Sequence, residues 1–435
     1  MGLTRRQFLG SSATAVVAGT MAKSTVFGAN DRIGIALIGC GSRGRSVTGG
    51  MMAEGAQLTH LCDLHPGRLD ETWGFLSNEQ EAEPEFVKNV EDVLASDEVD
   101  AVVVATPDHW HAPLSVLACQ AGKDVYVEKP HSHNIFESRK MVEAAEKYDC
   151  LVQVGTQNRS GEYVKEAREL IRNGMLGEIP FARVFSRVLQ EGPFHLDEPT
   201  DPPEGFDWNT WLGPVPTDWP YHPRLFNNGW YQFWDFTGAD IALDGVHQID
   251  MALMLMGDPG MPKSVRCVGG QYLRPEDDSE SPDFQTVTWE FDDAIMAYDT
   301  NGCHEYMRMH GPFWPMNADR IELYGEDRFM YAGRHGRGVQ VLERDGEEIE
   351  SLDGPWPDRE HYANFLHCVE TREKPTADIA IAHTSNVMIH MANIAHRLGN
   401  ISLGYDAETG AFDNDEANAM IRPERREEFA IPDEV

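Results

Sequence analysis

The sequence has no surplus of positive charge. Its 435 residues include 36 Lys and Arg against 72 Asp and Glu, a formal net charge of −36. A surface this acidic repels phosphate backbones and anionic lipid headgroups, so the composition argues against nucleic-acid binding and against charge-driven membrane binding. The length fits two or three domains, and the 41% hydrophobic content is enough for sizeable cores.

Long apolar runs and cysteine motifs are also missing. No stretch of about 18 apolar residues occurs, which argues against an ordinary membrane-spanning helix. The seven cysteines are odd in number, widely spaced and without a CxxC pair, so they predict neither a disulfide framework nor a structural zinc site. His109 and His111 have no third ligand at a suitable spacing, so no metal site is predicted.

The first 30 residues carry an export pattern. Arg5 and Arg6 precede a mildly apolar run over residues 8–22, and no acidic residue occurs before Asp31. The pattern resembles a twin-arginine signal, which implies the twin-arginine translocase as a partner, a periplasmic location and no membrane attachment after cleavage. The other interpretation is a frayed tail with a coincidental arginine pair. We exclude residues 1–30 from the predicted fold.

From residue 31 the sequence alternates strands with helices. Short apolar runs predict buried strands over residues 33–38, 57–62, 100–105, 124–127 and 151–155. The run over residues 135–148 predicts a helix. This alternation predicts an α/β fold with a parallel, doubly wound sheet, whose carboxyl edge is where ligands bind. We assign residues 31–157 to this Rossmann domain.

A glycine-rich turn joins the first predicted strand to a helix. Gly39 permits a tight turn, Gly41 lets a pyrophosphate approach the backbone, and Gly44 lets the helix pack on the strand. Free N–H groups at the start of the helix would face the phosphates. The predicted cofactor-binding residues of this motif are Gly39, Gly41, Ser42, Arg43 and Gly44.

Asp63, at the end of the second predicted strand, indicates which dinucleotide binds. Its carboxylate would accept hydrogen bonds from the adenosine ribose and would repel a 2′-phosphate. The sequence therefore favours NAD over NADP. Arg68 lies close enough in sequence to keep NADP open.

Five features then follow one another in a fixed order. They are GCGSRG at residues 39–44, Asp63, TPDHWH at residues 106–111, AGKDVYVEKP at residues 121–130, and GVHQID at residues 245–250. Together they resemble the glucose–fructose oxidoreductase/inositol dehydrogenase (Gfo/Idh/MocA) family. This resemblance implies a Rossmann domain followed by a domain with a large open mixed sheet. It also implies oxidation of sugar or polyol hydroxyls, or reduction of the ketones, with NAD(P).

The resemblance assigns roles to particular residues. Lys129 matches the family lysine that contacts the nicotinamide ribose and the reacting oxygen, where an ammonium group would stabilise a forming alkoxide. Pro130 matches a proline with a cis peptide bond, and His247 matches the catalytic histidine that exchanges the hydroxyl proton. The family's cofactor-lining positions correspond to Thr106, Pro107, His111 and Glu128.

The sequence also predicts the helix that carries His247. Asp240 is a suitable N-cap and Gly257 a suitable C-cap. Asp244, His247 and Asp250 would lie along one flank, and neighbouring carboxylates would favour the charged imidazole. We take Lys129, His247 and Asp244 as catalytic. Spacing alone also fits a buried histidine bonded to Asp250.

One position departs from the family pattern. The family often has Asp or Asn four residues before the catalytic histidine, where this sequence has Leu243. Asp244 is displaced by one residue, which rotates a helical side chain by about 100°. The departure leaves ordinary polyol dehydrogenation open to question.

Residues 188–238 form an aromatic-rich segment without clear periodicity. Aromatic faces stack on sugar rings, so the segment is a candidate for the substrate pocket, with Tyr231 as a substrate residue. The alternative is that its aromatics pin a long loop to the core. Gln157 and Arg159 follow the strand over residues 151–155 and face the same crevice. We assign Gln157 to the cofactor, and Arg159 and Asp250 to the substrate.

The rest of the chain, residues 158–435, is predicted to form the second domain. Alternating segments over residues 265–271, 284–291, 294–301 and 320–325 predict strands of its sheet. An open sheet exposes a broad face, so a homo-oligomer is expected.

Three functions fit these observations. The first is an exported oxidoreductase that moves a hydride between tightly held NAD(H) and a carbohydrate. The second is a redox-neutral glycoside hydrolase or isomerase with transient sugar oxidation, which needs an additional base such as Asp244, Asp250 or a tyrosine. The third is a non-catalytic sugar or nucleotide binder, if Leu243 marks a decayed site. Intact Lys129 and His247 favour the two enzymes.

Overall fold

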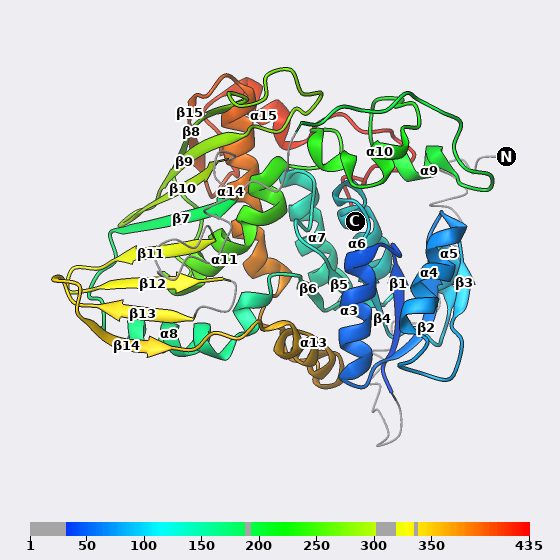
Figure 1. Cartoon of the computed structure of the whole chain (residues 1–435), viewed down its shortest axis with the longest axis horizontal. Coiled ribbons are helices and arrows are strands. Elements are labelled where there is room, and N and C mark those ends of the chain that lie inside the picture. The colour runs from blue at the N-terminus through cyan, green and yellow to red at the C-terminus, as the bar shows by residue number, and fades with distance from the viewer. Residues whose placement is uncertain (1–31, 188–192, 302–318, 335–337) are drawn as a thin grey trace.

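The computed structural model describes residues 32–187, 193–301, 319–334 and 338–435, and the predicted export signal lies outside these ranges. The described chain forms two sheets of different kinds, on the right and the left of Figure 1. Each sheet is covered by helices, as the α/β prediction requires. No helix in the described ranges is both long enough and apolar enough to cross a bilayer.

The sheet on the right is the Rossmann domain. Its six strands are all parallel in the order β3-β2-β1-β4-β5-β6. The strands are β1 (Gly34–Ile38), β2 (Gln57–Cys62), β3 (Glu85–Val87), β4 (Ala101–Val104), β5 (Asp124–Val127) and β6 (Val152–Val154). The helices are α3 (Ser42–Ala53), α4 (Pro66–Leu76), α5 (Val90–Ala95), α6 (His111–Gln120) and α7 (Ile135–Tyr148). Strands β1, β4 and β5 are buried along their whole length, which explains their continuous apolar runs.

The sheet on the left has ten strands, in the order β14-β13-β12-β11-β7-β10-β9-β8-β15-β16. They are β7 (Phe181–Arg187), β8 (Ser264–Gly270), β9 (Phe284–Glu290), β10 (Ile295–Asn301), β11 (Arg320–Tyr324), β12 (Phe329–Gly333), β13 (Val339–Leu342), β14 (Glu348–Leu352), β15 (Ser402–Asp406) and β16 (Ala411–Phe412). Strands β7 and β10 pair in parallel and their other neighbours are antiparallel, so the sheet is mixed, as expected.

One face of this sheet is buried and the other is open. Helices α8 (Glu162–Arg172), α11 (Val246–Leu255) and α14 (Ile379–Arg397) contribute to a shared core with its inner face. Burial alternates along β8 and β9, the pattern of a half-buried strand. On the outer side Val268, Ile295 and Tyr324 are exposed.

The end of the chain returns to the Rossmann domain. Helix α13 (Asp358–Thr371) lies beside α3 in Figure 1 and places Tyr362 and Phe365 in the core that also holds Tyr126. Ile379 and Val435 pack into the core on the other face of the sheet. The segment assigned from the sequence to the second domain therefore shares both Rossmann cores.

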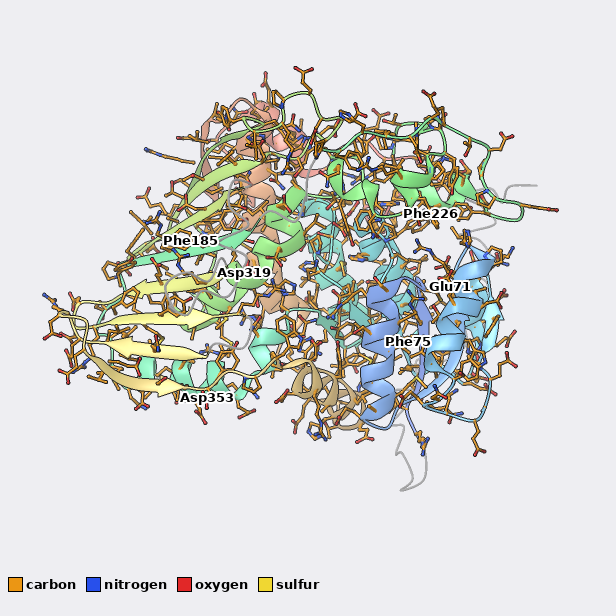
Figure 2. All side chains as sticks on the ribbon, viewed as in Figure 1. Glu71, Phe75, Phe185, Phe226, Asp319 and Asp353 are labelled. Carbon is orange, nitrogen blue, oxygen red and sulfur yellow. The ribbon has the colours of Figure 1, made fainter. Side chains whose placement is uncertain are left out.

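The aromatic-rich segment covers the Rossmann domain at the top of Figure 1, where α9 (Trp208–Leu212) and α10 (Pro223–Phe226) lie. Its buried side chains form one aromatic cluster together with Leu243 of the following segment. The members from the aromatic-rich segment are Phe194, Phe206, Trp211, Leu212, Val215, Tyr221, Leu225, Phe226, Trp230, Phe233 and Phe236. Phe226 is labelled in Figure 2. For these members, the interpretation that the aromatics pin a loop to the core is confirmed; residues 188–192 lie outside the described ranges.

Candidate active site

The carboxyl ends of the parallel strands bring the predicted cofactor residues to one edge. Gly39 has φ +95°, and a Cβ there would lie 2.7 Å from the Ala105 carbonyl oxygen. A Cβ on Gly44 would lie 2.4 Å from the Gly39 oxygen, whereas one on Gly41 would meet only Arg68, at 3.5 Å. The first and last glycines are therefore required by packing, and the middle one faces open space, which suits an approaching pyrophosphate.

Asp63 is held beside this turn by backbone amides. Its carboxylate oxygens accept hydrogen bonds from the N–H groups of Cys40 and His65, both at 2.8 Å. Burial raises the pKa of Asp63, while these two amides and Arg68 lower it. The Arg68 guanidinium stacks over Phe226 at 4.3 Å, so the aromatic cluster reaches this end of the site.

Three further cofactor candidates belong to one hydrogen-bonded network. Glu128, which directly follows β5, accepts a bond from Arg43 Nε at 2.8 Å and one from the Tyr126 hydroxyl at 3.4 Å. Gln157 donates to that hydroxyl at 3.2 Å. The other carboxylate oxygen of Glu128 is buried without a partner among the described residues, so the network has acceptor capacity left for a ligand.

His111 ties two loops of this edge together. Its ring nitrogens lie 2.7 Å from the Pro130 carbonyl oxygen and 2.8 Å from that of Thr106. The Lys129–Pro130 peptide bond is cis, as predicted, and Pro107 precedes the short helix η1 (Asp108–Trp110). His111 therefore fixes the shape of the edge through backbone contacts, and the buried Thr106 hydroxyl has no partner among the described residues.

Lys129 crosses from the Rossmann domain to the second domain. Its Nζ donates to the Leu243 carbonyl oxygen at 2.5 Å. An ammonium group has three donors, so two remain for a ribose and a reacting oxygen. Burial lowers the pKa of Lys129, and the carboxylates of Glu128, Asp108 and Asp244 oppose this shift.

The backbone around Leu243 explains the departure from the family pattern. The segment η4 (Ile241–Gly245) is a π-helical turn that leads into α11. Asp240 stands at the predicted N-cap position immediately before η4, but its side chain makes no capping hydrogen bond. Hydrogen-bond spacing changes where a π turn meets an α-helix, which leaves carbonyls available to outside donors. Leu243 contributes its carbonyl to Lys129 while its side chain packs in the aromatic cluster.

His247 lies on the turn after this π segment and is buried. Its Nδ1 has no hydrogen-bond partner among the described residues. Burial lowers the pKa of His247 well below its usual value, and Arg334 and Lys129 lower it further against the opposing effect of Asp244. The prediction that neighbouring carboxylates favour the charged imidazole is therefore wrong: burial and two cations outweigh them. The neutral ring can accept a proton.

The carboxylate of Asp244 is surrounded by several hydrogen-bond donors. Its carboxylate accepts bonds from Ser186 Oγ at 3.1 Å and Gln248 Nε2 at 3.2 Å, and it pairs with the Arg334 guanidinium. It acts on the pKa values of both Lys129 and His247, so the three predicted catalytic residues are brought together.

Asp250 points away from this group. It pairs with Arg159, whose Nε lies 2.7 Å from Asp250 Oδ2, and it also accepts a bond from Ser385 at 3.0 Å. Arg159 reaches Asp258 as well, at 2.9 Å. The alternative of a His247–Asp250 hydrogen bond is not observed. Because Arg159 and Asp250 satisfy each other, we assign them to the packing of the second domain.

Two side chains that the sequence analysis missed lie at the site. Asp108 is buried, accepts a bond from Thr237 at 2.6 Å, and acts on the pKa values of Lys129 and Tyr231. Burial raises the pKa of Asp108 to about 7, against the lowering effect of Lys129. Arg334 follows β12, and its buried Nε has no partner within the described ranges. Asp108 is part of the TPDHWH motif and could have been found through it. Arg334 belongs to no motif, so no signal in the sequence pointed to it.

Tyr231 lies at the same place from the aromatic side. Burial raises its pKa to about 12, and the carboxylates of Asp108 and Glu128 raise it too. Of the three predicted substrate residues, the structure therefore brings Tyr231 to Lys129 and its neighbours, and keeps Arg159 and Asp250 apart in their own ion pair.

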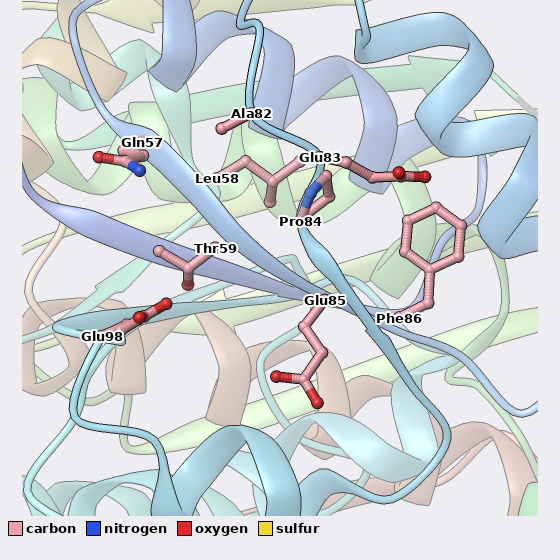
Figure 3. Close-up of a pocket in the computed structure, with 9 residues that line it drawn as sticks. All are labelled: Gln57, Leu58, Thr59, Ala82, Glu83, Pro84, Glu85, Phe86 and Glu98. Atoms are coloured by element: carbon pink, nitrogen blue, oxygen red, sulfur yellow. The ribbon is translucent and has the colours of Figure 1, made fainter.

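A separate surface depression of about 450 Å³ lies at the opposite edge of the Rossmann sheet (Figure 3). Gln57, Leu58 and Thr59 at the start of β2 and Glu85 at the start of β3 line it. These are amino ends of strands, where Rossmann folds do not bind their ligands, so it is not the substrate site. In the described part of the chain no group of three or more His, Cys, Asp or Glu is placed to hold a metal.

Comparison with known proteins agrees with this geometry. Residues 33–156 match the family model "Oxidoreductase family, NAD-binding Rossmann fold", residues 214–330 the "GFO/IDH/MocA C-terminal domain", and residues 320–431 the "Oxidoreductase family, C-terminal alpha/beta domain". A "Glycosyl hydrolase family 109 protein" from Shewanella pealeana is 28% identical over 189 residues, which is 41% of each chain. The matched part thus spans less than half of that relative.

Solved structures share the fold at lower identity. The aldose-aldose oxidoreductase from Caulobacter crescentus, complexed with glycerol, has a TM-score of 0.64 and 17% identity, covering 86% of this chain and 100% of that chain. The WlbA dehydrogenase from Bordetella pertussis, in complex with NADH and UDP-GlcNAcA, has a TM-score of 0.63 and 18% identity, covering 86% and 99%. The chain belongs to the Gfo/Idh/MocA family of NAD(P)-dependent oxidoreductases.

Proposed function

We propose that this protein is an exported oxidoreductase that transfers a hydride between a nicotinamide cofactor and a sugar or polyol hydroxyl or its ketone. One observation carries the proposal: Lys129, at the carboxyl end of β5, bonds to Leu243 beside a neutral, buried His247, whose Nδ1 has no partner in the part of the chain that the structure describes. A hydrogen-bond donor and a proton acceptor side by side are what alcohol oxidation needs.

Lys129, His247 and Asp244 have different roles in the proposed reaction. Lys129 holds the reacting oxygen with a donor not used by Leu243 and stabilises negative charge on it. His247 takes the hydroxyl proton in oxidation and returns it in reduction. Asp244, fixed by Arg334, Ser186 and Gln248, orients this pair rather than acting as the base, because its oxygens already accept several bonds. The nicotinamide ring, when bound, supplies or accepts the hydride.

The glycine turn, Asp63, Thr106, Glu128 and Gln157 would hold the dinucleotide. We propose NAD as the preferred form because Asp63 stands next to the turn, although its pairing with two backbone amides and the nearby Arg68 leave room for NADP. We also propose a periplasmic location through the twin-arginine translocase. A compartment without a nicotinamide pool favours a tightly held cofactor that is recycled within the site.

A second candidate is a redox-neutral glycoside hydrolase or isomerase, in which oxidation at one sugar carbon acidifies the neighbouring C–H bond. It needs an acid–base group besides His247. The relatives named glycosyl hydrolase family 109 favour this candidate, and Asp108, with a pKa near 7 beside Lys129 and Tyr231, is better suited than Asp250. Cleavage would leave the redox state of the cofactor unchanged overall.

The first test is made on full-length protein purified after export. Its near-ultraviolet absorbance and nicotinamide fluorescence are recorded, and the nucleotide released on denaturation is identified. Stoichiometric NAD(H) that survives dialysis supports a self-recycling site, and glycosides are then screened for cleavage without added cofactor. Weak, reversible NAD binding favours a conventional dehydrogenase and argues against export. A protein that binds no dinucleotide contradicts both enzymes.

We further propose that the open face of the ten-stranded sheet mediates self-association. Val268, Ile295 and Tyr324 are apolar or aromatic, lie on three of its strands and are exposed. Light scattering on the purified protein should give a mass above one chain, and Ile295→Lys should lower it. A wild-type monomer at micromolar concentration would contradict this proposal.

A further inference from the structure

Two buried thiols meet at one edge of the Rossmann domain, away from the candidate active site. Cys119 lies in the last turn of α6, and Cys150 lies between α7 and β6. Their Sγ atoms are 2.7 Å apart, closer than two sulfur atoms in ordinary packing contact. The exposed fractions are 1% for Cys119 and 8% for Cys150.

The other cysteines in the described ranges make a useful contrast. Cys40, Cys62, Cys267 and Cys368 are also buried. Cys40 bonds to the Cys62 carbonyl oxygen at 3.7 Å, and Cys267 contacts Gln285 at 3.6 Å, so these sulfurs meet oxygen or nitrogen rather than another sulfur. Among the described cysteines, Cys119 and Cys150 are therefore the pair already placed for a covalent link.

We propose that Cys119 and Cys150 form a disulfide bond when the protein meets a disulfide oxidant. One thiolate attacks the oxidant disulfide and releases a thiol, and the second thiolate then displaces the other half of the oxidant. The Cys119–Cys150 S–S bond forms, the S–S bond of the oxidant breaks, and the two thiol protons and two electrons pass to the oxidant, which leaves as two thiols. A small disulfide such as oxidised glutathione is sufficient, and the reaction does not depend on the proposed enzymatic function.

The link would enclose the segment that carries Lys129. The 31-residue separation between the two cysteines contains β5, the Lys129–Pro130 bond and α7. Cys150 Sγ also lies 3.0 Å from the Lys123 carbonyl oxygen, just before β5. A disulfide would therefore join the end of α6 to the start of β6 on either side of β5, and it would reduce the freedom of this segment in the unfolded chain.

Burial decides what kind of disulfide this is. Burial raises the pKa of the Cys150 thiol well above its usual value, and the adjoining Cys119 and Asp124 raise it further. Thiolate is therefore scarce, and exchange is slow in both directions. The bond belongs to the structural class, which forms once and resists reduction, rather than to the class of reactive redox pairs.

Mass spectrometry of the full chain tests the proposal. The folded protein is incubated with oxidised glutathione until no further change occurs, then alkylated in denaturant and digested. We expect one cross-linked peptide pair joining Cys119 to Cys150, lighter by two hydrogens, and alkylation of the other five of the seven cysteines. Alkylation of both Cys119 and Cys150, or a link from either to another cysteine, overturns the proposal.

A thermal measurement gives a second, independent test. One sample of the oxidised wild type is reduced in denaturant and refolded, and a second sample is left oxidised. The reduced sample should have a melting midpoint several degrees lower than the oxidised one. Cys119→Ala and Cys150→Ala should show no such shift, whereas the matched control Cys267→Ala should keep it. A wild-type midpoint that does not respond to reduction overturns the stabilising role. If an alanine variant fails to fold, the peptide map of the wild type still decides.

Discussion

The two halves of the candidate site are built in different ways. On the Rossmann side, Gly39, Asp63 and Glu128 each follow directly after a parallel strand and Thr106 lies two residues after β4, so regular geometry brings them to one edge. On the other side, Asp244 and His247 stand at a π-helical turn, and Arg334 comes from the end of a distant strand. Regular backbone positions the cofactor half, and irregular backbone positions the proton-transfer half.

The comparison extends along the continuous helical segment formed by η4 and α11. Two aspartates six residues apart each form a buried ion pair with an arginine: Asp244 with Arg334, and Asp250 with Arg159. The first pair influences the pKa values of Lys129 and His247, and the second links α11 to Ser385 of α14. Similar ion pairs therefore lie beside the proposed catalytic residues at one end of this segment and hold packed helices together at the other.

The largest expected effect is the loss of activity on replacing Lys129. Lys129→Met should lower kcat/KM for hydride transfer by about 10³-fold, because it removes the donor to the reacting oxygen. Lys123→Met is the matched control: Lys123 is also a buried lysine, and its Nζ donates to the backbone carbonyls of Ser96 and Val99 at 2.7 and 2.8 Å. Its loss should alter stability and leave kcat/KM nearly unchanged. Steady-state kinetics are measured on both variants. An equal loss of activity in the two would contradict the role proposed for Lys129.

The two aspartates of the helix give the next test. Asp250→Asn removes the buried counter-charge of Arg159 and leaves it only the more exposed Asp258 among the described residues. The variant should lower the free energy of unfolding by about 3 kcal/mol, with kcat/KM of the folded protein retained. Asp244→Asn should also destabilise, and it should lower kcat/KM about 10²-fold because Lys129 and His247 lose their orienting anion. Urea unfolding and kinetics on the same preparations separate the two effects. Equal kinetic losses would remove the distinction between the pairs.

The contribution of Asp108 to the free energy of unfolding should depend on pH. Its pKa is about 7 in the folded protein against an ordinary value of 3.8. Between these values the unfolded chain has released the proton that the folded protein keeps, so this contribution to stability is present at low pH and is lost as the pH rises through 7. The stability difference between wild type and Asp108→Asn should change by about 2 kcal/mol from pH 5 to pH 8.

Urea unfolding at several pH values measures this difference, and Asp70→Asn, at an exposed position, serves as the control. The Asp108→Asn difference should change with pH by about 2 kcal/mol more than the control difference. An equal change in both would show that Asp108 keeps an ordinary pKa, and would weaken its candidacy as a second acid–base group.

The smallest expected effect concerns the cofactor. Asp63→Ser removes a negative charge next to the glycine turn and should tighten NADP binding about tenfold, while NAD binding weakens slightly. Arg68→Gln should act in the opposite direction on NADP and hardly affect NAD. Calorimetric titration with both dinucleotides tests this. A preference for NADP in the wild type would reverse the proposed cofactor choice.

The sequence predicted much of the Rossmann half to within a residue or two. Strands β2 and β5 and helix α7 begin and end at the residues predicted for them, because the local hydrophobic pattern marks each of them. Strand β3 was missed because three residues are too few for a pattern. Lys129, His247 and Asp244 were found through motifs, and they do lie together.

What the sequence alone determined was therefore local: the parallel strands, the glycine turn whose packing admits no side chain at Gly39, and the residues at strand ends. Only the tertiary structure decided which partner each charged group takes. It gave Asp250 to Arg159 and Asp244 to Arg334, turned Leu243 into a backbone acceptor, and brought Cys119 against Cys150. The physical reason is that strand ends follow from short-range periodicity, whereas these contacts join residues 31 to 114 positions apart and depend on how whole elements pack.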